Sequence, residues 1–141
     1  MKSQVRITGN LEIFNCDGNN VSRIDIDNLV VKSGKDFIAK RVAGTSVPLI
    51  SLMAVGTQNT APTVDDTELG TEIANITLTS TVVNENVITY SATFAAGVAT
   101  GNLTEAGLFN SAGDMLSHAQ FNEINKTSSN AIIIAWNIHI I

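Results

Sequence analysis

Leu52-Met53-Ala54-Val55-Gly56-Thr57 and, further along the chain, Thr104-Glu105-Ala106-Gly107-Leu108-Phe109-Asn110 are the stretches that decide the fold. Each is a short, largely apolar run that is interrupted or ended by glycine. Runs of this length, bounded by turn residues, are typical of buried strands. The two stretches are therefore predicted to be strand-and-turn pieces of a compact β module, and neither contains catalytic chemistry.

Apolar residues alternate with polar ones through most of the chain, and this period of two is typical of strands with one buried face. After the N-terminal region, strands are predicted at 49–55, 73–83, 87–94, 103–110, 115–121 and 131–140. The predicted fold class is mainly β: an antiparallel β-sandwich or flattened barrel with a long N-terminal hairpin and one short α-helix. The whole chain, 1–141, is predicted to be a single β domain, in which 49–141 supplies these strands.

The N-terminal region is predicted to form a long hairpin over residues 3–31, because alternating aliphatic residues flank an Asp-Gly turn signal. Two roles stay open for this hairpin: an added arm that grips a partner, or strands that complete the core. The short helix follows at 33–43, with Ser33 as its N-cap, Gly44 as its stop and Phe37 packed on a sheet.

The composition argues against several classes of function. The formal net charge is −5 and no cluster of Lys and Arg is present, so nucleic-acid binding is not expected. No apolar stretch approaches the length of about 20 residues that spans a bilayer, so no membrane association is expected. Cys16 is the only cysteine, which rules out an intrachain disulfide and fits synthesis in a reducing cytoplasm.

Residues 57–70 are predicted to form an irregular loop with one helical turn at 66–69. The loop carries Asp65, Asp66 and Glu68, which are candidates for a hard-cation site but lack the alternating Asx residues and central Gly of a calcium loop. The alternative is that these carboxylates occupy a helix N-terminus, where free amides favour negative charge. We expect no metal and no other cofactor.

No enzymatic activity is expected from the remaining polar residues. His118, with a Ser and an Asp, has the residue types of a catalytic triad. However, the sequence has no Gly-x-Ser-x-Gly, and Ser117 is adjacent to His118 and therefore points to the opposite sheet face.

Glu105 and Trp136 are candidates for structural or interface roles. A carboxylate between apolar Leu103 and Ala106 is predicted to accept hydrogen bonds from loop amides and so to lock the 57–70 loop. Its alternative role is contact with a partner. Trp136 is predicted to pack in the core with its N–H hydrogen-bonded, and its alternative role is that of an interface anchor.

The stretches Leu52–Thr57, Asp65–Glu72 and Thr104–Asn110, in this order, resemble a module of structural proteins of tailed bacteriophages. The resemblance is completed by Asn125-Lys126-Thr127 and an aliphatic last strand, and it runs from about Asn28 to Ile141. The module is found in tail-collar fibre proteins and in small virion surface proteins.

The resemblance implies a bacteriophage virion structural protein, first of all a capsid decoration (cement) protein on the outer surface of the head. The alternative is a tail-collar or tail-fibre adaptor protein. A third class, a carbohydrate- or receptor-binding module, is disfavoured because aromatic residues make up only 5% of the chain.

The implied partners are the major capsid protein or tail and collar proteins, and the protein would reach the virion after synthesis in the host cytoplasm. A homotrimer is expected, because phage fibres and head decorations cluster about threefold axes. The aliphatic strand from Ile132 to Ile141, which offers both faces for burial, is a second argument for it.

Overall fold

A computed structural model describes residues 4–141. This part of the chain forms nine strands and one helix: β1 (Ile7–Asp17), β2 (Asn20–Val30), α1 (Lys32–Val42), β3 (Ile50–Gly56), β4 (Glu72–Thr77), β5 (Ser80–Asn84), β6 (Val87–Phe94), β7 (Gly101–Asn110), β8 (Met115–Lys126) and β9 (Asn130–Ile140).

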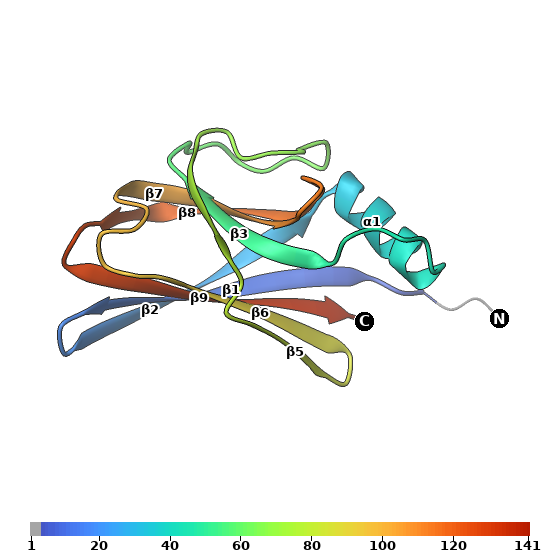
Figure 1. Ribbon diagram of the computed structural model, residues 1–141, viewed down its shortest axis with the longest axis horizontal. Coiled ribbons are helices and arrows are strands. Elements are labelled where there is room, and N and C mark those ends of the chain that lie inside the picture. The colour runs from blue at the N-terminus through green and yellow to red at the C-terminus, as the bar shows by residue number, and fades with distance from the viewer. Residues whose placement is uncertain (1–3) are drawn as a thin grey trace.

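The strands of the described residues form one antiparallel sheet in the order β4-β3-β7-β8-β2-β1-β9-β6-β5. The sheet curls into a half-barrel with two facing layers (Figure 1). The consecutive strands β4 and β5 lie at its two ends. In the short segment that connects β4 to β5, the amide of Leu78 donates to the carbonyl oxygen of Ser51 in β3 (3.0 Å). The next amide, that of Thr79, donates to the carbonyl oxygen of Ser91 in β6 (2.7 Å). This corner ties the two ends of the sheet together.

The mainly β fold class predicted from the sequence is confirmed, with one strand divided. Residues 73–83 were expected to be continuous, but β4 pairs with β3 whereas β5 pairs with β6. The backbone therefore leaves one layer for the other at the corner. Alternation of side chains cannot reveal this change, because it does not show which neighbour a strand has.

The N-terminal hairpin completes the core and is not an appended arm. Its predicted first residue, Ser3, lies outside the described residues. β1 lies between β2 and β9, where Leu11 is opposite Trp136 and Ile13 is opposite Ile134. Both β1 side chains are almost fully buried, at 0% and 1% exposure.

The helix begins earlier than the sequence predicts, at 32 rather than 33. Ser33 is not its N-cap: Val31 holds that position without a side-chain cap, and the Ser33 hydroxyl donates to the Met115 carbonyl oxygen at 2.8 Å. The start is fixed by packing, because Val31 is fully buried against β8. Gly44 (φ +79°) and buried Phe37 are as predicted. Within the described residues, no helix is long and apolar enough to cross a membrane.

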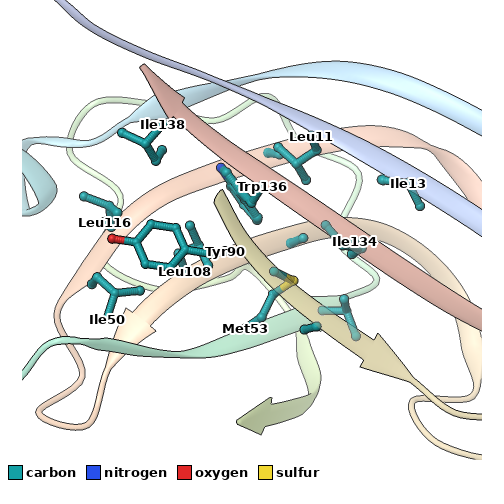
Figure 2. Close-up of a cluster of buried hydrophobic side chains, with 14 of the residues drawn as sticks. Leu11, Ile13, Ile50, Met53, Tyr90, Leu108, Leu116, Ile134, Trp136 and Ile138 are labelled. Carbon is teal, nitrogen blue, oxygen red and sulfur yellow. The ribbon is translucent and has the colours of Figure 1, made fainter. Parts of the chain in front are cut away.

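The main hydrophobic core lies between the two layers. Figure 2 shows inward-facing side chains of β1, β6 and β9 gathered with those of β3, β7 and β8. Members from each strand are Leu11, Tyr90, Trp136, Met53, Leu108 and Leu116. Hydrophobic burial on this scale accounts for the half-barrel, because each strand contributes alternate side chains to one interior.

We predict that Leu11→Ala lowers the free energy of unfolding by about 2–5 kcal/mol, because it leaves a cavity in the centre of the core. Val21→Ala in the same hairpin is the control, since Val21 is 63% exposed and its truncation is expected to cost no more than about 0.5 kcal/mol. Urea unfolding of both variants measures the difference. Two equally small effects would mean that the hairpin is not part of the core.

Candidate functional site

Residues 57–71 leave β3 and return to β4 as a long loop that covers the outer face of β3, β7 and β8 (Figure 1). Leu69 is its hydrophobic contact, packing with Ala54 and Met115 in a second, smaller core. The helical turn predicted at 66–69 is absent from this described segment, and the backbone turns at 64–65 instead. The amide of Gly70, which would close a helical turn that begins at Asp66, donates to Glu105 instead.

Glu105 of β7 is the residue that holds the loop. Its side chain is 1% exposed and accepts hydrogen bonds from the backbone amides of Gln58 (2.9 Å), Gly70 (2.8 Å) and Thr71 (2.8 Å). These amides come from both ends of the loop, so one carboxylate holds the two ends of the loop together. These are the loop-amide hydrogen bonds that the sequence predicts for Glu105.

His118 of β8 extends the contact to the middle of the loop. Its Nε2 lies 3.1 Å from Oε1 of Glu105 and its Nδ1 lies 2.8 Å from Oδ2 of Asp66. Asp66 also accepts hydrogen bonds from the amide (2.9 Å) and hydroxyl (2.8 Å) of Thr63. Burial alone would raise the pKa of Asp66, but the hydrogen bonds from Thr63 and His118 outweigh it and hold this pKa below its usual value.

Asp66, His118 and Glu105 form a hydrogen-bonded chain, here called the latch, between the loop and the sheet. Carboxylates only accept hydrogen bonds, so His118 satisfies Asp66 and Glu105 together when both of its ring nitrogens carry protons. The chain of hydrogen bonds from Asp66 through His118 to Glu105 connects the loop to β8 and β7.

Two glycines leave the space that this latch needs. A Cβ at Gly56 would lie 2.3 Å from the Thr71 carbonyl oxygen and 2.6 Å from Oε2 of Glu105. A Cβ at Gly107 would lie 3.0 Å from the end of the Leu69 side chain. Glycine at these positions therefore lets the loop lie directly on the sheet.

The acidic residues of the loop separate in the structure. Asp66 turns inward to His118, whereas Asp65 and Glu68 are exposed beside a hollow of about 320 Å³ under the loop. The helix N-terminus considered for them is wrong, because the segment is not helical. Across residues 4–141, no group of three or more His, Cys, Asp or Glu side chains is placed to hold a metal ion.

Trp136 lies on β9 in the centre of the main core (Figure 2). It is 0% exposed, so its core position is confirmed and it cannot serve as an interface anchor. Its expected hydrogen bond is wrong: within the described part of the chain, the indole N–H has no partner. Burial of the large ring outweighs the cost of that one group.

Sequence reasoning missed the role of His118. The residue is far from Asp66 in sequence, and it comes near Glu105 only through the pairing of β7 with β8, in which Gly107 lies opposite His118. Residues two apart on one strand share a face, so this pairing places Glu105 and His118 on the same face. The proximity of His118 to Glu105 can be recognised only once the register between β7 and β8 is known.

Lys126 was also not recognised from the sequence. Its side chain is 1% exposed, and its Nζ donates to the carbonyl oxygens of Ala95 (2.7 Å) and Thr127 (3.2 Å). It therefore fixes the connections that follow β6 and β8, so the Asn125-Lys126-Thr127 stretch has a structural role.

Comparisons of the chain with protein-family models, with curated proteins and with solved structures found no match. Its fold and site define the protein as a small antiparallel β half-barrel with a long loop that is hydrogen-bonded to a buried carboxylate.

We predict that Glu105→Gln weakens the latch, because the amide is uncharged and presents a donor where the loop offers donors. The free energy of unfolding should fall by about 1–3 kcal/mol, the cost of leaving a buried hydrogen-bond donor without its acceptor. Limited proteolysis should cut the loop at 57–71 faster than in the unchanged protein. Glu68→Gln is the matched control, since Glu68 is exposed on the same loop, and equal cleavage of both variants would contradict the latch.

We predict that the loop opens in acid partly through Asp66. The folded state lowers the pKa of this group from its usual 3.8, so the unfolded state binds more protons in this range. The stability it contributes is present above pH 3.8 and is lost as the pH falls through the lower, folded pKa. The protection of the loop amides against hydrogen exchange, measured from pH 5 downward over about two pH units, reports this loss. Asp66→Asn should flatten the dependence, and an unchanged profile would contradict the prediction.

Proposed function

We propose that the protein is a structural component of a tailed-bacteriophage virion, and that it decorates the outer surface of the capsid. The proposal rests on the resemblance of its motifs to a virion module, and on what those motifs do in the folded chain.

The observation that supports the proposal is that the motif stretches meet at one point. Leu52–Thr57 ends beside Glu105, Asp65–Glu72 donates two amides to it, and Thr104–Asn110 contains it. The most distinctive part of the sequence is therefore used to fix a loop on a sheet. A signature used in this way fits an assembly protein, whose function depends on a surface of fixed shape.

The aromatic side chains favour assembly over sugar binding. Carbohydrate sites commonly stack sugars on exposed aromatic rings. Every Phe, Tyr and Trp of residues 4–141 is buried or half-buried, and only Phe14 and Phe109 among them are half-buried. The surface therefore offers little for a sugar to stack on.

The partners we propose are the major capsid protein or, in the alternative, tail and collar proteins. The homotrimer stays a prediction that rests on the resemblance and on the aliphatic last strand. This strand is β9, and Ile133 on its outer face is 37% exposed. Alternate residues from Ile132 to Ile138 fill the core, whereas Asn137 and His139 lie on the outer face and are hydrogen-bonded to neighbouring strands.

We predict that gold-labelled antibodies against the protein mark the heads of intact virions in electron microscopy. Antibodies against the major capsid protein provide the positive control, and preimmune serum provides the background. Label confined to the tail would replace the decoration role with the collar or fibre-adaptor role. Virions that carry no label, and no peptides of the chain in mass spectrometry, would overturn both.

A further inference from the structure

β2 has a free edge along most of its length. Within the described residues, β2 pairs with β8 only at Leu29 and Val30, whereas Asn20 to Asn28 pair with β1 alone. The edge is well exposed, with Val21 63% and Ile24 37% accessible. A long unpaired edge presents a row of free backbone groups that can add another strand.

The hairpin turn determines which backbone groups point outward from this edge. The turn is Gly18–Asn19, so the closing pair Asp17 and Asn20 is hydrogen-bonded and the pairs alternate from there. The amides and carbonyls of Val21, Arg23, Asp25 and Asp27 therefore point away from β1. An added strand would bond to these four residues.

Charges on the edge normally discourage pairing, but here they leave one symmetric arrangement favourable. If two β2 strands paired antiparallel about Arg23, the two Arg23 side chains would face each other, and pairing about Asp25 would oppose two Asp25 side chains. Pairing about Ile24 instead places each Arg23 opposite the other copy's Asp25. Ile24 is also the midpoint of the free segment Asn20 to Asn28, so this register gives the longest overlap.

The side chains of a single copy are already arranged for this contact. Arg23 binds Asp25 of its own strand at 2.9 Å, and its guanidinium lies 5.6 Å from the centre of the Phe14 ring, so it is held on one face of the edge. Ile24 lies on the other face, opposite Ile13. In the pair, the two Ile24 side chains would cover each other, while each Arg23 would lie between two Asp25 carboxylates.

We propose that two copies of this chain join edge to edge through β2, antiparallel about a twofold axis at Ile24, and so form one continuous sheet. The contact is independent of the proposed virion function. It is an isologous contact, in which the same segment serves on both sides. It joins copies in pairs and could therefore also connect closed clusters of other symmetry.

Cysteine substitution tests the register directly. In the proposed pair, position 24 is a non-hydrogen-bonded site opposite itself, where Cα atoms lie about 4.5 Å apart, within the range that a disulfide spans. We expect Ile24→Cys, in a Cys16→Ser background, to give a covalent dimer on mild oxidation. Ser22→Cys and Ile26→Cys in the same background are matched controls on the same face, and neither should cross-link because each is opposite a different residue.

A charge exchange tests the specificity of the contact. Arg23→Glu added to the Ile24→Cys variant should abolish the covalent dimer, because it opposes two carboxylates. Further addition of Asp25→Arg should restore the dimer, because opposite charges then meet again across the axis. Thermal unfolding confirms that each variant is folded. Equal cross-linking at 22 or 26, absence of cross-linking at 24 in a folded variant, or no response to the charge exchange would overturn the proposal.

Discussion

The buried carboxylate of Glu105 is the constraint on which the surrounding structure depends. A charge that is removed from water costs several kcal/mol unless hydrogen bonds and opposite charge replace its hydration. Three loop amides and His118 replace it here. The conformation of the 57–71 loop is therefore largely set by one side chain on a strand, since the loop has to deliver its amides to that point.

This constraint fixes the loop to the sheet below it. Long loops are usually among the most mobile parts of a domain. In this chain the Leu69 contact adds apolar burial to the hydrogen bonds, and Gly56 and Gly107 allow the loop to approach closely. A partner that binds the outer surface of the loop would therefore lose little conformational entropy in ordering it.

The sequence predicts the strands well because alternation survives in single segments, and it also predicts that Glu105 binds loop amides. The information it lacks is the pairing of strands. The division of 73–83 into two strands, the approach of His118 to Glu105 and the central place of β1 each depend on which strand lies beside which. Ser33 failed as a cap for a related reason: burial of Val31 against β8 set the start of the helix.

The central position of β1 also has a consequence for the order in which the chain can fold during synthesis. Its partner on one side is β9, so Leu11 must wait for Trp136, which is synthesised after all the other strands of the sheet. Pairings between such distant residues slow folding, because the chain must close a long loop before the contact stabilises it. Until then the hairpin exposes the apolar face of β1, and the nascent chain is most prone to aggregate in that interval.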